Sequence, residues 1–281
     1  MENLIGNYIQ KFGCRNDFEY RNALREVAQR IVLCGIARSR LFDSAVFYGG
    51  TSLRILRDLD RFSEDLDFVM IEDASVDFAE CMNFAVKELA SFGIDASVQI
   101  KEKNVQTGVI SSYVKFNLRD TMKKAGIDIA AASNENMSIK AELETSVAEA
   151  GNTEFKTVVW PGFAKVRTFD MPTMFSSKLM AVLERNRKSR VKGRDFYDYL
   201  FYMSREVVPN YDYLTAALRK KEKIGEDETV DPGMLKTMLK DRFEAVDFES
   251  AWNDVSAFVS SDRMKYAFDR DLFISTLEHI R

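Results

Sequence analysis

The sequence predicts an α+β fold, in which a mixed sheet flanked by helices is followed by a helical C-terminal lobe. In the first part of the chain, short apolar or period-two runs, typical of strands, are interspersed with runs of helical spacing. From about residue 171 onward the apolar spacing is helical throughout. At 281 residues the chain is long for one domain and short for three, so we expect two closely packed lobes, residues 1–165 and 166–281.

The composition limits the classes of protein to consider. A net charge of −4 gives no overall attraction to nucleic acid, so any such binding needs a local patch. The three cysteines lack metal-ligand spacing, so buried reduced thiols are expected. No stretch is apolar enough to span a bilayer and the first residues lack the features of a signal peptide, so we expect a cytoplasmic protein without membrane contact. His279 is the only histidine, which leaves carboxylates, lysine or arginine for any catalysis.

The chain begins with a long helix, predicted over residues 18–40, and a short buried strand over 45–48. The strand leads into Gly49 and Gly50, where a sharp turn and a close approach of the backbone are sterically allowed. Thr51 then opens a helix with a stripe of leucines. Because the first N–H groups of a helix are free and carry the positive end of its dipole, this turn suits a phosphate.

A pair of carboxylates follows the glycine turn. Residues 65–70 alternate in polarity like a strand, which places Asp65 and Asp67 on one face. Two carboxylates held together repel each other, and Mg²⁺ that bridges carboxylates and substrate phosphates is the common solution. A solvated strand edge would have the same pattern, but the coupling to a diglycine turn favours a site.

The middle of the chain is predicted to supply a third carboxylate. The expected elements are a helix over 76–91 with Ser75 as N-cap, a hairpin over 96–117, a polar loop over 130–137 and a strand over 138–145. In the last strand Lys140, Glu142 and Glu144 share one face. Because a two-metal site uses a third carboxylate on a neighbouring strand, Glu142 is the first candidate and Glu144 the second. The charged outer face of an amphipathic strand would look the same.

The second lobe opens with a basic segment. After a break at residues 160–162 and a last strand or linker at 166–170, a helix that begins around Pro172 carries Lys178. Six of the ten residues from Arg185 to Arg194 are basic. Basic runs are usually solvated loops. Beside a lysine and a helix that begins Arg-Asp, this one suits a triphosphate, because the arginines neutralise phosphates and the lysine stabilises the charge of the departing pyrophosphate. The remaining helices, predicted over 211–221, 232–240, 248–259 and 271–279, carry no motif.

Two segments together resemble a known family. Gly49-Gly50-Thr51, followed by Arg61-Phe62-Ser63-Glu64-Asp65-Leu66-Asp67-Phe68, resembles the first motif of the polymerase-beta-type nucleotidyltransferase superfamily, with Thr51 in place of its serine. Within it, the Gly-Gly-Thr-x-Leu-Arg form is similar to the AbiEii/AbiGii toxin family of abortive-infection and type IV toxin–antitoxin systems. The segment from Lys178 to Asp198 resembles that family's downstream motif, whose lysine and aspartate are functional. The resemblance implies a nucleotidyltransferase-type sheet, a growth-inhibiting toxin with a separately encoded antitoxin, and tRNA 3′ ends as the acceptor.

Motifs and resemblance together predict a Mg²⁺-dependent nucleotidyltransferase, with two ions, that moves a nucleoside monophosphate from an NTP to a hydroxyl of tRNA or another RNA. The resemblance gives catalytic roles to Lys178 and Asp195, with Asp198 in reserve. The full set of candidates is Asp65, Asp67, Lys178 and Asp195 for catalysis, Asp65, Asp67 and Glu142 for metal, and Gly49, Gly50, Thr51, Arg61, Ser63, Arg185 and Arg194 for the nucleotide.

Two other functions are compatible with the same residues. The site could transfer onto a protein, by phosphorylation or nucleotidylation of the antitoxin. The fold could also be a partner module that binds an NTP without turnover, although the intact pair of Asp65 and Asp67 argues against this. The base of the NTP is not specified by any motif.

Overall fold

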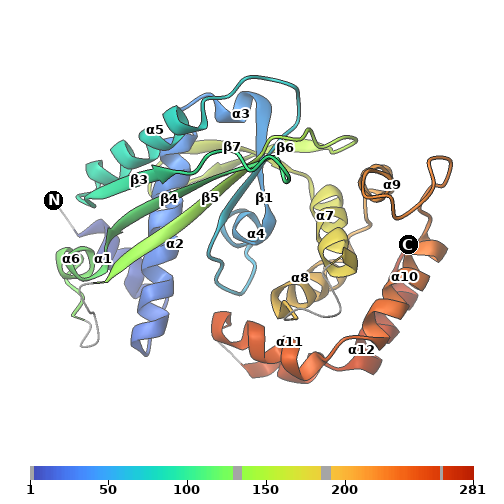
Figure 1. The fold of residues 1–281 in the computed structure, drawn as a ribbon. Helices are drawn as coiled ribbons and strands as arrows, with labels where there is room; N and C mark the ends of the chain where they lie inside the picture. The colour runs from blue at the N-terminus through green and yellow to red at the C-terminus, as the bar shows by residue number, and fades with distance from the viewer. Residues whose placement is uncertain (1–2, 129–134, 185–190, 260–261) are drawn as a thin grey trace. The chain divides into compact units, whose positions relative to one another are not determined.

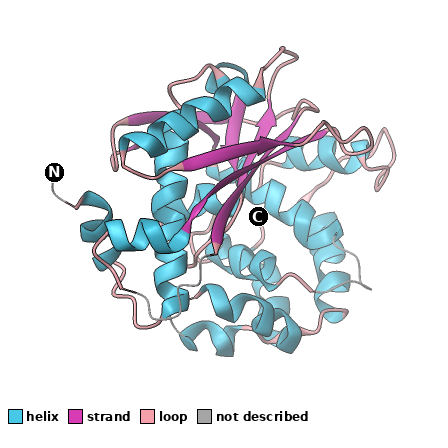
Figure 2. Cartoon of the chain, turned by 60° about the vertical axis from the view of Figure 1, so that its left-hand side comes forward, coloured by secondary structure: helices cyan, strands magenta, loops and turns pink. Residues whose placement is uncertain are grey.

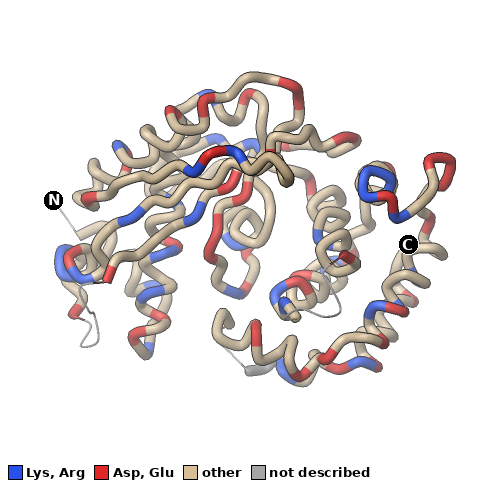
Figure 3. Tube along the Cα trace, viewed as in Figure 1, with Lys and Arg blue, Asp and Glu red and all other residues tan. Residues whose placement is uncertain are grey.

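The computed structural model describes residues 3–128, 135–184, 191–259 and 262–281 (Figure 1). The chain divides into two compact units, each built from separate stretches of sequence. The first unit comprises Met1–Asp58, Phe62–Ala148 and Glu154–Thr168, and the second comprises Leu59–Arg61, Glu149–Thr153 and Phe169–Arg281. No helix in the described ranges is long and apolar enough to cross a membrane. Charged residues of both signs are interspersed along each unit (Figure 3).

A seven-stranded mixed sheet organises the first unit, with the order β3-β4-β5-β2-β1-β7-β6. The central strand β2 is antiparallel to β1 and parallel to β5, while β1 is parallel to β7. The strands are β1 (Ala45–Tyr48), β2 (Leu66–Met70), β3 (Ala96–Ile100), β4 (Val109–Asn117), β5 (Asn136–Glu144), β6 (Thr153–Val158) and β7 (Ala164–Phe169).

The core of the first unit lies between the sheet and two long helices, α2 (Asp17–Ile36) and α5 (Phe78–Ser91). Because side chains alternate along a strand, Phe47 and Phe68 enter this core while the neighbouring Asp67 points to the opposite face. The shorter helices of the unit are α1 (Leu4–Gln10), α3 (Leu41–Ser44), α4 (Gly49–Arg57) and α6 (Leu118–Lys124). Helix α4 contacts β1 and β2, and β2 is the strand that contains Asp67.

The second unit is helical apart from short strand ends (Figure 2). Its core is aromatic: Tyr199 and Tyr202 of α8 are fully buried and pack with Phe175 of α7. These two tyrosines are therefore core residues of the second unit. The helices are α7 (Met171–Glu184), α8 (Gly193–Met203), α9 (Tyr211–Lys220), α10 (Pro232–Glu244), α11 (Phe248–Val255) and α12 (Arg270–Ser275), with 3-10 turns at Ser256–Phe258, Asp262–Ala267 and Thr276–His279.

The predicted α+β fold, with a mixed sheet and flanking helices, is confirmed, and several boundaries differ. Helix α4 begins at Gly49, two residues before Thr51, and α2 ends at Ile36. The N-cap of α5 is Asp77, whose side chain accepts a hydrogen bond from the Glu80 N–H at 2.9 Å, so the prediction of Ser75 was wrong. Helix α6 and strand β6 were not predicted. Part of the predicted loop over 130–137 lies outside the described residues, and β5 already begins at Asn136.

Candidate functional site

The start of α4 lies directly against the carboxylate of Asp67. In the antiparallel register of β1 and β2, Tyr48 is the partner of Asp67, so the next residue, Gly49, passes beside it. The backbone of Gly49 has φ +80°, and a Cβ on this residue would lie 2.7 Å from Asp67 Oδ2. Glycine is therefore required both for its conformation and for its lack of a side chain. The geometry brings the predicted glycine turn and the second aspartate together.

Asp65 lies just before β2, on a segment whose backbone is held by other side chains. The hydroxyl of Thr51 donates to the carbonyl oxygen of Asp65, and the side chain of Thr51 is fully buried. The carbonyl oxygen of Ser63 accepts a hydrogen bond from Gln29 Nε2 at 3.1 Å. Thr51, predicted to bind the nucleotide, thus has its hydroxyl on the protein backbone, which leaves its own N–H as the group that could meet a phosphate.

Strand β5 places Glu142 beside Asp67. The two residues are register partners in the parallel pairing of β2 and β5, so their side chains share one face of the sheet. Glu144 pairs instead with Val69, and its carboxylate accepts from Ser146 Oγ at 2.6 Å. This register supports Glu142 over Glu144 as the residue closer to the aspartates.

Lys140 is a member of this group that was not among the predicted site residues. Its Nζ lies 2.6 Å from Glu142 Oε2, while Glu142 Oε1 accepts a hydrogen bond from Ser111 Oγ at 2.8 Å. Burial by itself would lower the pKa of Lys140, but its hydrogen bond and charge interaction with Glu142, together with the charge of Asp65, raise that pKa above its ordinary value. The alternation of the strand already placed Lys140 on the face of Glu142. Its ion pair with the carboxylate of Glu142 was found only from the structure.

The carboxylates of this group suit a magnesium ion that is shared with the phosphates of a substrate. Within the part of the chain that the structure describes, no group of three or more His, Cys, Asp or Glu side chains is arranged to hold a metal ion. Mg²⁺ is commonly bound by one or two carboxylates and the phosphates of a substrate, and does not need a cage made only of protein. Asp65 and Asp67, two carboxylates on one face of the sheet, fit that role. Both oxygens of Glu142 have protein partners, Ser111 and Lys140. Glu142 as a third ligand stays a prediction.

A second cluster of charged residues lies within the second unit, around Lys178 of α7. Its Nζ lies 2.9 Å from Asp195 Oδ1 and 2.9 Å from Asp198 Oδ2, both on α8. Asp198 also accepts two hydrogen bonds of 2.7 Å from Nε and Nη2 of Arg61. Asp198 is fully buried and Arg61 is 3% exposed. The cluster is therefore a desolvated network of two acids and two bases.

The network shifts the pKa values of Asp198 and Lys178 in the directions that keep both side chains charged. Burial alone would raise the pKa of Asp198, but Arg61 and Lys178 outweigh it and lower that pKa below the ordinary value. Burial alone would lower the pKa of Lys178, but Asp195 and Asp198 raise it above the ordinary value. Lys178 is consequently an ammonium ion at neutral pH.

The predicted phosphate-binding arginines have different surroundings. The guanidinium of Arg61 is directed onto Asp198, and the nearby Tyr197 hydroxyl donates to the carbonyl oxygen of Asp60 at 3.0 Å. Residues 59–61 are thus bound to α8. The guanidinium of Arg194 lies over the ring of Phe258, 4.4 Å from its centroid. Arg185 lies outside the described residues. Phosphate binding by these arginines stays a prediction.

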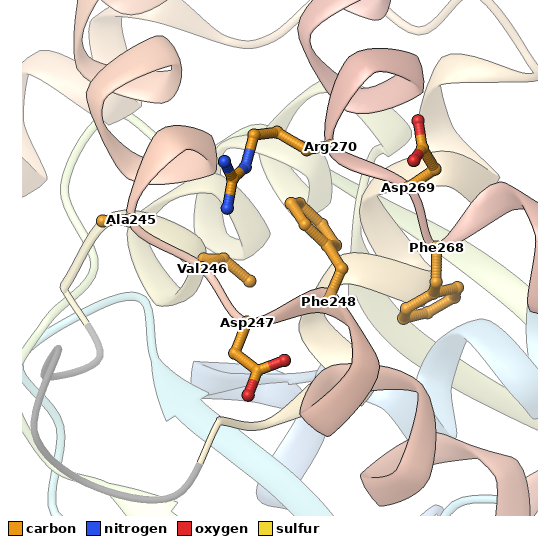
Figure 4. Close-up of a pocket in the computed structure, with 7 residues that line it drawn as sticks. All are labelled: Ala245, Val246, Asp247, Phe248, Phe268, Asp269 and Arg270. Atoms are coloured by element: carbon orange, nitrogen blue, oxygen red, sulfur yellow. The ribbon is translucent and has the colours of Figure 1, made fainter.

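A depression of about 400 Å³ lies elsewhere in the second unit (Figure 4). Its lining includes none of the predicted site residues. The carboxylates of Asp247 and Asp269 at its rim cap the N-termini of α11 and α12, which accounts for their presence there. The residues that line it are Ala245, Val246, Asp247, Phe248, Phe268, Asp269 and Arg270.

Comparison with known proteins agrees with the chemistry of these residues. Residues 31–272 match the family model described as nucleotidyl transferase AbiEii toxin, type IV TA system, a range that includes both aspartates and Lys178. Two solved Helicobacter pylori proteins are similar in structure. The first, JHP933, has 18% identity and a TM-score of 0.48, over 92% of this chain and 88% of that chain. The second, described as a candidate nucleotidyltransferase, has 19% identity and a TM-score of 0.49, over 90% and 89%. No curated protein matches the sequence.

Proposed function

The chain belongs to the AbiEii family of nucleotidyltransferase toxins of type IV toxin–antitoxin systems, and we propose that it moves a nucleoside monophosphate from an NTP to the 3′ end of a tRNA, with Mg²⁺. The protein is a nucleotidyltransferase, and its family implies a separately encoded antitoxin as a partner. The acceptor, the metal and the residue roles below are proposals. With tRNA and NTP as substrates, the reaction takes place in the cytoplasm.

The observation that carries the proposal is the contact between the start of α4 and Asp67. Gly49 has no side chain, and Oδ2 of Asp67 lies only 2.7 Å from the position that a Cβ would take. The N-cap residue Tyr48 makes no capping bond with its side chain. We propose that the N–H groups of Gly50 and Thr51, at the positive end of the helix dipole, bind phosphate oxygens. A triphosphate bound there would have its metal-binding oxygens beside Asp67.

Asp65 and Asp67 would hold Mg²⁺ together with the triphosphate, and Glu142 would join a second ion once Lys140 releases it. The bound metal would neutralise the phosphates and make the acceptor hydroxyl more acidic. In the transfer, the acceptor oxygen bonds to the α-phosphorus as the bond from that phosphorus to the bridging oxygen breaks. The hydroxyl proton passes to solvent, and pyrophosphate leaves with the electron pair of the broken bond.

The remaining roles follow from the charge of the groups and from the family resemblance. Lys178, kept protonated by its two carboxylates, stabilises the charge that develops on pyrophosphate, and Asp195 orients it. Ser63, Arg61, Arg185 and Arg194 complete the proposed nucleotide-binding set. In this division of roles the sheet-containing part holds the nucleotide, and the helical lobe supplies the lysine.

Transfer of label from an NTP tests the proposal directly. The protein is incubated with Mg²⁺, total tRNA and each of the four NTPs labelled at the α-phosphate, and the products are separated into RNA and polypeptide. Label in RNA that requires Mg²⁺ and is absent with Asp67→Asn supports the proposal. α-Label in polypeptide indicates nucleotidylation of protein. A parallel incubation with γ-labelled NTPs detects phosphorylation, which gives label in polypeptide from the γ-labelled but not from the α-labelled NTP. Binding of NTP without incorporation into either product refutes the proposed transfer to tRNA.

A further inference from the structure

The backbone that precedes the carboxylate strand is held at three consecutive carbonyl groups. Gln29 Nε2 donates to the carbonyl oxygens of Ser63, at 3.1 Å, and Glu64, at 2.8 Å. The hydroxyl of Thr51 donates to the next carbonyl oxygen, that of Asp65. Two side chains from two different helices, α2 and α4, thus bind the segment that ends in the first aspartate.

Both of these side chains are shielded from water. Gln29 is 1% exposed and Thr51 is fully buried. The donors are buried and the three hydrogen bonds are partly buried, so water competes less with them than at the surface, and loss of a donor weakens the hold on the segment. The segment 63–65 therefore has a defined place and cannot shift without the loss of these bonds.

A partly buried ion network centred on the buried Glu26 joins α2 and α4. Glu26, one turn before Gln29 on α2, accepts hydrogen bonds from Arg54 of α4 at 2.7 Å and from Arg30 at 2.8 Å. The guanidinium of Arg54 also lies over the ring of Phe62, 5.0 Å from its centroid. Helix α2 consequently holds α4 through Glu26 and the segment 63–65 through Gln29.

The two aspartates differ in what determines their positions. Asp67 lies inside β2 and is paired in register with both β1 and β5. Asp65 precedes the first residue of that strand, Leu66, so its backbone position depends on the segment before it. A pair of carboxylates that shares a cation needs a defined separation, because misplacement by about 1 Å weakens a functional site.

We infer that Gln29 and Thr51 are positioning residues, which set the place of Asp65 relative to Asp67 by binding the carbonyl groups of residues 63–65. This inference rests on the proposed role of the two aspartates in metal binding. It gives the Thr51 side chain a role on the protein backbone, with the phosphate left to the backbone N–H groups of α4.

The test uses pairs of variants that remove equally buried groups. Thr51→Val deletes the hydroxyl that binds the Asp65 carbonyl, and Ser52→Ala deletes the adjacent buried hydroxyl, which pairs with Thr168 Oγ1 at 3.1 Å. Gln29→Met removes the two bonds from α2, and Asn22→Leu changes another buried amide of the same helix. Thr51→Ser keeps a hydroxyl and serves as the rescue variant.

Two readouts are measured on the full chain. The first is the affinity for Mn²⁺ without nucleotide, from electron paramagnetic resonance, and the second is backbone hydrogen exchange of residues 61–68. We expect Thr51→Val and Gln29→Met to weaken Mn²⁺ binding by about tenfold and to exchange faster over 61–68. Ser52→Ala and Asn22→Leu should stay within about twofold of wild type in both, and Thr51→Ser should restore both.

The outcomes separate this inference from the proposed function. If Thr51→Val and Gln29→Met match their control variants in exchange and Mn²⁺ affinity, the inference is overturned. If the wild-type protein neither binds Mn²⁺ nor transfers a nucleotide, the proposed function fails, while the exchange of residues 61–68 still decides whether the two side chains hold the segment. Thermal melting of each variant identifies any that unfolds, and Gln29→Met replaces Thr51→Val in that case.

Discussion

Replacement of Asp198 by asparagine should destabilise the second unit strongly. Asp198 is fully buried and accepts hydrogen bonds from Arg61 and Lys178. The neutral amide that replaces the carboxylate would remove the negative charge that Arg61 and Lys178 share and turn its NH2 group toward one of these cations, while Lys178 keeps its bond to Asp195. Removal of one partner of a buried ion pair costs about 3–5 kcal/mol. At about 2–4 °C per kcal/mol, the Tm should fall by about 6–20 °C.

Thermal and urea melts of wild type, Asp198→Asn and Asp241→Asn measure this effect. Asp241 is an exposed residue of α10, so its replacement should change the stability by less than about 0.5 kcal/mol. Asp195→Asn should cost less than Asp198→Asn, because Lys178 keeps its bond to Asp198. An Asp198→Asn protein that melts within about 2 °C of wild type, a margin of about 1 kcal/mol, would refute this account of the network.

The dependence on pH provides a second check. Because the pKa of Asp198 is lower in the folded protein, its contribution is fully present above the unfolded value of about 3.9 and is lost as the pH falls through the folded pKa. The stability difference between wild type and Asp198→Asn should therefore be constant between about pH 5 and 8 and shrink below about pH 4. A difference that shrinks on the alkaline side instead would contradict the assigned direction.

Three further changes test the first unit. Asp67→Asn should keep the Tm of wild type within a few degrees but reduce nucleotide transfer by roughly 10²-fold or more, and a normal rate in this variant would remove Asp67 from the mechanism. Lys140→Met removes the cation beside Glu142 and should tighten Mn²⁺ binding by roughly tenfold, whereas unchanged affinity would show that Lys140 does not compete with the metal. Gly49→Ala and Gly93→Ala both place alanine at positive φ, and only at Gly49 does the new Cβ meet a carboxylate, so melts should show a larger loss for Gly49→Ala than the roughly 1 kcal/mol expected at Gly93.

The elements that the sequence predicts well are those defined by a local pattern. The apolar run 45–48 and the alternation around Asp65 and Asp67 correspond to β1 and β2. The missed elements lack such a pattern: α6 has only seven residues, and β6 has a single buried residue, Val158, at its end, preceded by half-buried and exposed residues. The N-cap of α5 was misassigned because Ser75 and Asp77 are both good capping residues, and only the backbone path distinguishes them.

The candidate site was harder to predict in its side-chain contacts than in its position. Arg61 and Thr51 stand beside the motif, so sequence reasoning directed both toward phosphate. In the structure Arg61 binds Asp198, 137 residues away in the chain, and Thr51 binds the carbonyl of Asp65. Contacts of this kind depend on tertiary packing, which single-sequence patterns do not contain. Lys140 lies on the face where alternation placed it, but its bond to Glu142 depended on side-chain conformation.

The assignment of residues 59–61 to the second unit has a consequence for any attempt to dissect the protein. A fragment that starts at Phe169 would contain α7 to α12 but would lack Arg61, so Asp198 would be left with Lys178 alone. It would also lack Asn152, whose N–H donates to Thr173 Oγ1 at 3.1 Å. The helical part is thus not an autonomous module that can be cut out or grafted at a single peptide bond. Fusion proteins and truncations should keep the stretch from α4 to β2 intact.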